Sequence, residues 1–261
     1  MRSLSIAATG MLAQQLNVEV ISNNIANLNT NAFKAQRAEF QDLLYQDERA
    51  VGANSSDSGT IVPVGVQIGT GVKAAAVYHI ATQGNLTQTS NPLDVAIQGH
   101  GYLQVQMPDG STSYTRDGSL QLSATGQLVT ADGYTIQPAI TIPQNTTSVS
   151  INANGQVMAQ VAGQTTPQTV GQIELANFPN EGGLAQQGNN LLTETPASGA
   201  ATTGNPGTTA FGTIQQGFIE TSNVNIVSEI TNLISAQRAY EMNSKVIQTS
   251  DQMMSTLNQI Q

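Results

Sequence analysis

The sequence contains no cysteine and no tryptophan, and its only histidines are His79 and His100. The lack of cysteine excludes disulfides, thiolate metal sites and thiol nucleophiles. A zinc site or a histidine-based triad would have to be built from two histidines alone. We therefore expect no catalytic residue, no metal site and no cofactor, and we predict that the protein is not an enzyme.

Charged residues are also scarce, at 10% of the 261 residues against ~25% in an ordinary soluble protein. Eight Lys and Arg stand against 17 Asp and Glu, which gives a net charge of −9. Nucleic acids and anionic membranes bind clustered Lys and Arg, so neither is an expected partner. With 39% apolar and only 4% aromatic residues, the composition is typical of secreted, assembling or extended β proteins.

Long hydrophobic runs are missing as well. No stretch approaches the ~18 apolar residues of a membrane span, so we expect no direct membrane insertion. The start of the chain has one Arg, but the polar residues Gln14, Gln15 and Asn17 come soon after it, unlike the unbroken apolar region of a signal peptide. We expect that, if the protein leaves the cytoplasm, it does so without a cleaved signal.

The amino-terminal end has the periodicity of a helix. Apolar residues recur there at steps of three, four and seven, close to a heptad seam: Leu4, Ala7, Met11, Val18, Ile21, Ile25 and Leu28. We expect the helix to end near residues 29–31, where Asn and Thr cluster. The many asparagines from Asn23 to Asn31 indicate either a frayed helix end or side-chain hydrogen bonds between subunits.

The carboxy-terminal end repeats this pattern over about forty residues. One stripe contains Ile226, Ile230, Leu233, Tyr240, Ile247 and Met254, and a second contains Val246, Met253, Leu257 and Ile260. A face this wide is typical of a helix with more than one neighbour. Ser222 or Asn223 is the expected N-cap. Arg238 is either a solvated charge or a member of an ion pair between helices.

The middle of the chain is strand-like. Dipeptides that favour turns recur at even spacing: Asp109-Gly110, Asp117-Gly118, Thr125-Gly126, Asp132-Gly133 and Asn154-Gly155. The alternating runs between them predict a meander of short antiparallel strands. In this interpretation Arg116 and Asp117 form a turn pair, and Asp94 lies on a polar strand face or in a turn contact.

Residues 40–72 lie between the first helix and the β region and predict an extended arm. Phe40, Leu43 and Leu44 anchor the outgoing side, and Val62, Val64, Val66 and Ile68 alternate like a returning strand. We therefore expect a mixed, mainly β fold: a coiled-coil-like pair of terminal helices, a β-hairpin arm and an antiparallel β domain. The expected segments are 1–31 (first helix), 32–73 (arm), 74–221 (β domain) and 222–261 (second helix).

Apolar stripes at both ends of a β protein have two possible partners. The helices pack on their own β domain, or they pack against the helices of other copies, which the wide carboxy-terminal stripe favours. A head-to-tail contact that does not close generates a helical polymer, whereas a closed one generates an oligomer such as a trimeric stalk. Periodicity alone leaves both open.

Three motifs resemble bacterial flagellar rod and hook proteins. Residues 21–34 read ISNNIANLNTNAFK, similar to the Asn-rich signature near the start of these proteins. Residues 91–99 read NPLDVAIQG and are followed by YTRDG at 114–118, which resembles the start of the family's β domain. Residues 222–253 resemble its carboxy-terminal motif. Within the family, the length and residues 40–72 are similar to the distal rod type.

This resemblance implies a structural role. A distal rod subunit polymerises into a rigid hollow drive shaft that transmits motor torque to the hook and passes exported subunits. The implied partners are further copies of itself, the proximal rod proteins, the hook protein, the L- and P-ring bushing proteins and the flagellar type III export apparatus. The implied location is the periplasmic rod of the basal body. The alternatives are a proximal rod or short hook-type protein of the same family and, from another class, a secreted β-domain adhesin with coiled-coil ends.

Overall fold

The computed structural model describes residues 2–49, 64–164 and 166–260. The chain divides into two compact units, each made from separate stretches of sequence. Unit 1 consists of Met1–Ala26, Gln36–His79 and Asn225–Gln261. Unit 2 consists of Asn27–Ala35 and Ile80–Val224. The chain therefore passes between the units at four points. The expected mixed, mainly β fold with a helix at each end is confirmed.

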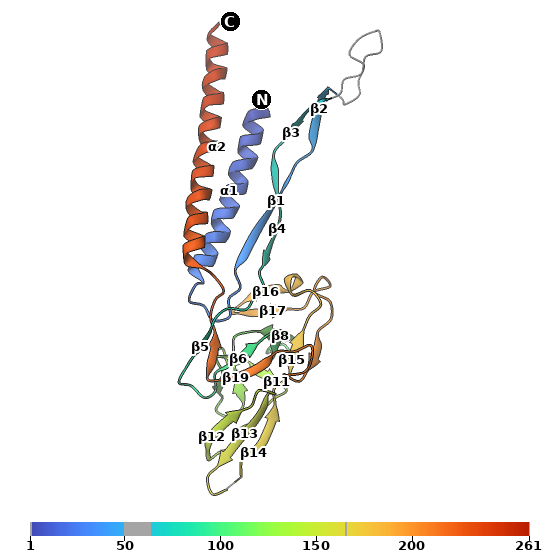
Figure 1. Ribbon diagram of the computed structural model, residues 1–261, viewed down its shortest axis with the longest axis vertical. Coiled ribbons are helices and arrows are strands. Elements are labelled where there is room, and N and C mark those ends of the chain that lie inside the picture. Colours follow the sequence, from blue (N-terminus) through green and yellow to red (C-terminus); the bar gives the residue numbers. More distant parts are fainter. Residues whose placement is uncertain (1, 50–63, 165, 261) are drawn as a thin grey trace. The chain divides into compact units, whose positions relative to one another are not determined.

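The two helices of unit 1 lie side by side and antiparallel (Figure 1). They are α1 (Arg2–Ala26) and α2 (Ile226–Ile260). The hydroxyls of Ser3 and Ser250 are 3.5 Å apart, and seven residues further along α1 Gly10 faces Asn243, seven residues earlier in α2. These two contacts align the antiparallel helices with each other, and coiled-coil packing of the pair stays a prediction.

Small side chains line much of the buried part of the helix pair. Ala7 and Ala13 on α1, and Ala236 and Ser250 on α2, are all less than 8% exposed. A Cβ atom at Gly10 would lie 2.9 Å from the side-chain nitrogen of Asn243. Small residues therefore let the two helix backbones approach closely, whereas the predicted seam consisted mainly of larger apolar residues.

The ends of both helices differ from expectation. α1 ends at Ala26, before the predicted cluster at 29–31. The N-cap of α2 is Asn225, not Ser222 or Asn223, because its side-chain oxygen accepts hydrogen bonds from the backbone N–H groups of Val227 and Ser228.

A long hairpin completes unit 1, as the sequence predicts for the arm. Its inner part pairs β1 (Gln36–Asp42) with β4 (Val72–His79), and its outer part pairs β2 (Tyr45–Arg49) with β3 (Val66–Gly69). Both β1 and β4 contact α1. The predicted tip, including Val62, lies outside the described residues.

Unit 2 contains strands arranged in several antiparallel sheets, the largest in the order β16-β17-β8-β7-β11-β10-β9, with β15 joined to β7 and β18 joined to β15. Strands β12, β13 and β14 form a separate sheet, and β19 pairs with β6 and β20 with β5. The strands and one short 3-10 helix are β5 (Leu86–Gln88), β6 (Val95–Gln98), β7 (Tyr102–Gln106), β8 (Thr112–Thr115), β9 (Gln121–Leu122), β10 (Leu128–Val129), β11 (Thr135–Gln137), β12 (Thr146–Ile151), β13 (Gln156–Val161), β14 (Gln168–Gln172), β15 (Leu175–Asn177), η1 (Glu181–Gly183), β16 (Ala185–Gly188), β17 (Leu191–Thr193), β18 (Thr202–Gly204), β19 (Thr213–Gln216) and β20 (Phe218–Glu220).

The core of unit 2 is aliphatic, with Val95, Leu103, Ile136 and Leu175 at most 1% exposed. A smaller aromatic cluster on the opposite face of β7 packs Tyr114 edge-on against Phe178, with ring centres 4.8 Å apart. Because alternate residues of a strand face opposite sides, β7 contributes to both clusters.

The predicted meander is interrupted at Gly118. The expected turns at Gly110, Gly126, Gly133 and Gly155 are present, each with a positive φ between 79° and 85°. At Gly118 the chain instead passes against β6, where the carbonyl of Gly118 accepts a hydrogen bond from the N–H of Val95. A Cβ atom at residue 118 would lie 1.7 Å from the Val95 oxygen, so this glycine permits a close approach and makes no hairpin. Strand β8 accordingly pairs with β7 and β17.

Candidate assembly surfaces

The terminal helices expose many large apolar side chains. On α2 these side chains are 42–70% exposed, and Leu12 on α1 is 67% exposed. They are Ile226, Val227, Ile230, Ile234, Tyr240, Met242, Val246 and Met253. Apolar surface concentrated on one element indicates a protein interaction surface, because its burial removes it from water. Within the described part of the chain, neither helix has an apolar stretch long enough to cross a membrane.

The predicted interface residues divide into two groups in the single chain. One group is buried or half-buried: Leu4, Ala7, Met11, Val18, Ile21, Ile25, Leu28, Leu233, Ile247 and Met254. The other group is exposed: Ile226, Ile230, Arg238, Tyr240 and Met253. The side chain of Leu257 lies outside the described part of the structure. The exposed group is available to another copy, and its role in subunit contacts stays a prediction.

The predicted arm residues show a similar division. Phe40, Leu43 and Ile68 are half-buried, whereas Leu44, Val64 and Val66 are 86%, 75% and 46% exposed. Leu44 lies between β1 and β2, and Val64 and Val66 lie at the start of the return. The outer part of the hairpin therefore also presents apolar side chains to its surroundings.

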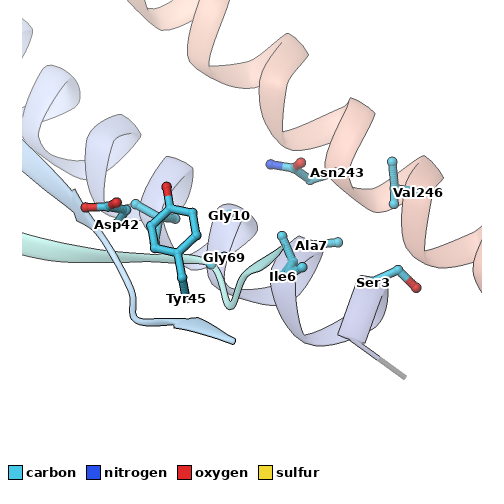
Figure 2. A pocket seen from close by; sticks show the side chains of 11 residues that line it. Ser3, Ile6, Ala7, Gly10, Asp42, Tyr45, Gly69, Asn243 and Val246 are labelled. Atoms are coloured by element: carbon cyan, nitrogen blue, oxygen red, sulfur yellow. The ribbon is translucent and has the colours of Figure 1, made fainter. Parts of the chain in front are cut away.

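A cavity of about 580 Å³ lies where the hairpin, α1 and α2 meet within unit 1. Figure 2 shows Tyr45 from the hairpin facing Ile6 and Gly10 of α1, with Asn243 and Val246 of α2 beyond them. Its wall is mostly apolar. Close by, the hydroxyl of Thr9 accepts a hydrogen bond from the N–H of Val72, which fixes β4 against α1.

The asparagine-rich end of α1 has a role inside the chain. The side chain of Asn24 donates to the carbonyl of Gln36 and accepts from its N–H, both at 2.8 Å. Asn24 is only 1% exposed. An amide side chain can satisfy both groups of one backbone residue, so Asn24 attaches the end of α1 to the start of β1. The sequence left two alternatives for these asparagines, a frayed helix end or hydrogen bonds between subunits. Asn24 fits neither, because it binds Gln36 of its own chain.

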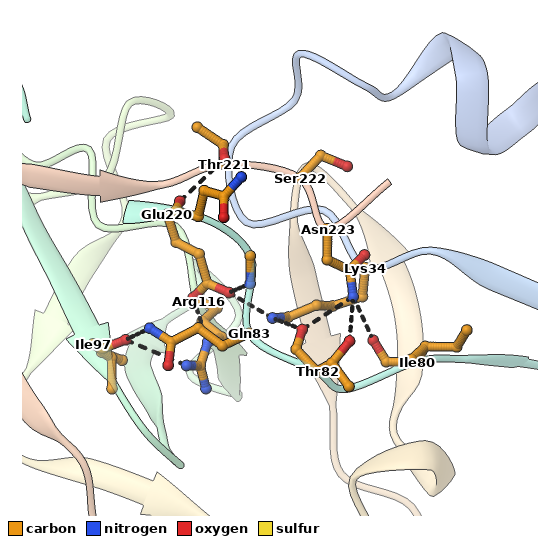
Figure 3. Close-up of polar contacts among 12 residues, drawn as sticks. Lys34, Ile80, Thr82, Gln83, Ile97, Arg116, Glu220, Thr221, Ser222 and Asn223 are labelled. Atoms are coloured by element: carbon orange, nitrogen blue, oxygen red, sulfur yellow. Dashed lines mark hydrogen bonds and ion pairs between the residues drawn. The ribbon is translucent and has the colours of Figure 1, made fainter. Parts of the chain in front are cut away.

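A buried ion network lies in unit 2. Glu220, at the end of β20, accepts hydrogen bonds from Lys34 through one carboxylate oxygen and from Arg116 through the other, each at 2.6 Å (Figure 3). The three side chains are at most 8% exposed. Arg116 also donates to the carbonyls of Gly101 and Gly99. The prediction that Arg116 pairs with Asp117 in a turn is therefore wrong for Arg116, because its guanidinium group is buried and binds Glu220 and the carbonyls of Gly99 and Gly101.

The electrostatics of this network favour the ionised carboxylate. Burial by itself would raise the pKa of Glu220, but the charges of Arg116 and Lys34 and the hydrogen bonds that they donate together hold it below its ordinary value. Burial, reinforced by the nearby charge of Arg116, lowers the pKa of Lys34. The two cations therefore repel each other while both stabilise Glu220.

Asn223 continues the same cluster. Its side-chain nitrogen donates to the carbonyls of Ile80 and Thr82 at 3.0 Å, and its oxygen accepts from the N–H of Ala35 at 2.7 Å. Figure 3 shows Asn223 beside Thr82 and Ile80. Lys34, Ile80 and Asn223 are close to three of the four points at which the chain leaves unit 2. The network thus holds these segments of unit 2 together.

Comparison with known proteins identifies the family. Three family models match separate parts of the chain: flagella basal body rod protein over residues 4–34, flagellar hook protein FlgE/F/G D1 domain over 96–159, and flagellar basal body rod FlgEFG protein C-terminal over 215–260. The flagellar basal-body rod protein FlgG of Caulobacter vibrioides is 60% identical over 260 residues, which cover 100% of this chain and 99% of the relative. The chain belongs to the FlgG family of flagellar basal-body rod proteins.

FlgG proteins of other bacteria are similar along their whole length. The Borreliella burgdorferi protein is 44% identical over 100% of this chain and 98% of its own length. The Bacillus subtilis protein is 39% identical, with 98% of each chain covered. The three matched regions contain α1, the start of the β domain and α2, so the resemblance of all three sequence motifs is confirmed.

In the described part of the chain, no group of His, Asp and Glu side chains could hold a metal ion.

Proposed function

We propose that this chain is the structural subunit of the flagellar distal rod and that copies of it assemble into a rigid, hollow helical shaft. The observation that carries the proposal is the set of exposed apolar side chains on the paired terminal helices, nearly all of them on α2. A single chain leaves this surface in water, and packing against the helices of neighbouring copies buries it. Membership of the rod protein family supports this interpretation over a surface adhesin.

In the proposed shaft, the terminal helices of many copies form the inner wall and the β domain forms the outer wall. Of the expected β domain, 74–221, residues 74–79 belong to β4 of the hairpin, so the outer wall begins at Ile80. The hairpin extends over neighbouring copies and restricts sliding between them. Its exposed residues Leu44, Val64 and Val66 supply the apolar contacts. Arg238, which forms no ion pair within the described residues, pairs with an acid on a neighbouring helix. The shaft transmits motor torque to the hook and passes exported subunits through its centre.

The proposed partners follow from that position. They are the proximal rod proteins at one end, the hook protein at the other, the L- and P-ring proteins around the shaft, and the flagellar type III export apparatus that delivers the chain. The proposed location is the periplasmic part of the basal body, reached without cleavage of a signal peptide. The relatives named FlgG favour this role over that of a proximal rod or hook subunit.

Electron microscopy of the purified protein under polymerising conditions tests the proposal. We expect straight hollow tubes, whose formation depends on protein concentration. A protein that stays monomeric at every concentration, salt and temperature tried would contradict self-assembly, and closed rings or trimers would favour a closed oligomer.

A further inference from the structure

A polar cleft opens in the main sheet of unit 2 where two strands diverge from the same edge of β7. Tyr102 and Leu103 of β7 pair with β15, whereas Gln104 to Gln106 pair with β11. Between β15 and β11 the sheet splits and leaves a cleft of about 390 Å³. The cleft is therefore built into the strand pairing.

Five polar side chains line this cleft: Gln104, Gln106, Gln137, Glu174 and Thr203. Gln104 and Gln137 are direct partners across β7 and β11, so they lie on the same face, and Gln106 shares that face by alternation. Gln104 is only 9% exposed. Among the residues that the structure describes, none of the five side chains has a hydrogen-bond or ion-pair partner. Among the described residues no side-chain nitrogen or oxygen is both buried and without a partner, so water reaches these groups and they can hydrogen-bond to a polar group that enters the cleft.

The one charged side chain of the cleft favours a cation. The three glutamine amides and the Thr203 hydroxyl can donate or accept, whereas the ionised Glu174 carboxylate only accepts, and no Lys or Arg lines the cleft. An arginine guanidinium carries five N–H donors and a positive charge, and a lysine ammonium carries three donors. Either group would be neutralised by Glu174 and hydrogen-bonded by the glutamines. An anion would meet the Glu174 carboxylate without a compensating charge.

The charges of the chain are divided unevenly between the two units. Unit 2 contains two bases, Lys34 and Arg116, and both are buried against Glu220. Its eight acids are Asp94, Asp109, Asp117, Asp132, Glu174, Glu181, Glu194 and Glu220. Every exposed Lys or Arg in the described chain therefore belongs to unit 1, and Arg2 of that unit pairs with Glu48. The remaining bases form no ion pair among the described residues: Arg37, Arg49, Lys73, Arg238 and Lys245.

We propose that the cleft at Gln104 and Glu174 binds an arginine or lysine side chain from the hairpin of a second copy of this chain. The inference rests on the proposed self-assembly. A polymer needs two different surfaces that complement each other, and here the acceptor is on unit 2 and the donor on unit 1. Arg37, Arg49 and Lys73 are the hairpin bases that form no ion pair with another described residue. The α2 bases are assigned to helix packing in the proposed shaft.

Two isosteric variants test the cleft in the assembling protein. Glu174→Gln removes the charge and Gln104→Leu removes the side-chain amide, with little change in volume. We expect each variant to raise the critical concentration for polymerisation roughly tenfold, because each loses about one charge-assisted hydrogen bond. Glu174→Gln should also make the critical concentration less dependent on salt. Asp132→Asn is the control: it removes the same charge from an exposed turn and should change neither the critical concentration nor its salt dependence. Equal critical concentrations for wild type and both cleft variants would overturn the proposal.

Charge exchange identifies the donor. Glu174→Arg should prevent polymerisation, and one of Arg37→Glu, Arg49→Glu or Lys73→Glu, placed in the same chain, should restore it. If none of the three restores polymerisation, the hairpin is not the donor and the proposal is overturned.

A measurement on the monomer separates this inference from the proposed function. N-acetyl-arginine amide should shift the side-chain amide NMR signal of Gln104 in the wild type and not in Glu174→Gln. A wild-type signal that does not respond overturns the cation site, even when the protein polymerises. A signal that responds in a protein that never polymerises contradicts the second copy as the source of the cation.

Discussion

Lys34 and Glu220 are 186 residues apart in the chain, yet the Lys34 nitrogen lies 2.6 Å from a carboxylate oxygen of Glu220. Arg116 reaches the other oxygen of the same carboxylate. One carboxylate therefore compensates two buried cations, and the loss of that carboxylate should affect unit 2 more than the loss of either cation.

We expect Glu220→Gln to lower the free energy of unfolding by about 3–5 kcal/mol, because it leaves two buried cations without a counter-ion. Urea denaturation followed by circular dichroism measures the change. Arg2→Met is the matched control, since it removes an ion pair whose side chains are about half exposed. That control should cost less than about 1 kcal/mol. Equal losses in the two variants would mean that the buried network does not stabilise unit 2.

The same network predicts how stability depends on pH. The pKa of Glu220 is lowered in the folded protein, so the unfolded chain binds more protons as the pH falls below the ordinary value of 4.5. The stability from Glu220 is present above pH 4.5 and is lost as the pH falls toward the folded pKa. A single group contributes a slope of at most about 1.4 kcal/mol per pH unit.

Urea titrations between pH 3 and pH 7 should show this slope in the wild type and a shallower one in Glu220→Gln. The lowered pKa of Lys34 acts in the alkaline range, where stability should rise as the pH approaches 10.5. Identical pH profiles for the wild type and Glu220→Gln would show that Glu220 is not linked to acid unfolding.

A substitution at Ile230 distinguishes an effect on assembly from an effect on folding. Its side chain is 45% exposed in the single chain, so Ile230→Asp should leave the melting temperature of the β unit unchanged. In a polymer the same change would bury an unpaired charge, at a cost of several kcal/mol, and sedimentation should detect no polymer. Asn232→Asp adds the same charge two residues away on an exposed polar position and serves as control. A large drop in melting temperature for Ile230→Asp would mean that this face packs on its own subunit.

The hairpin should control the stiffness of the polymer. Deletion of residues 47–66 removes the outer part of the hairpin and leaves β1 and β4 paired. We expect the deletion protein to polymerise into curved or flexible filaments, because the contacts that restrict sliding between copies are lost. Persistence length measured from electron micrographs tests this. Filaments as straight as the wild type would leave this segment as an ordinary surface loop.

Local sequence patterns predicted the elements whose geometry is local. Apolar residues that recur every three or four positions from Leu4 to Ile25 identified α1. Apolar residues at every second position from Val64 to Ile68 identified the returning strand. The glycine turns at Gly110 and Gly133 were also visible, because a positive φ favours glycine. The helix seam was only partly predicted. Ala236 and Ser250 carry no strong hydrophobic signal and are buried because they are small.

Contacts between distant segments could not be predicted. Nothing near Lys34 or Arg116 in the sequence indicates that Glu220 would pair with both. The hydrogen bond from the Ala35 N–H to the Asn223 side chain is equally invisible in the sequence. Gly118 comes after a turn-forming Asp, as Gly110 and Gly133 do, and only its approach to Val95 distinguishes it. The Gln104 cleft depends on which strands share the edge of β7, and that pairing is set by the whole sheet.

The four passages of the chain between the units have a consequence for the order in which the protein can form. Unit 2 is nearly continuous, from Ile80 to Val224 with one short addition, so it is complete before α2 is synthesised. α1 precedes nearly all of unit 2 in the chain, and its partner α2 follows it. A growing chain therefore carries α1 without its partner helix while unit 2 is made, and the helix pair can close only after unit 2 is complete.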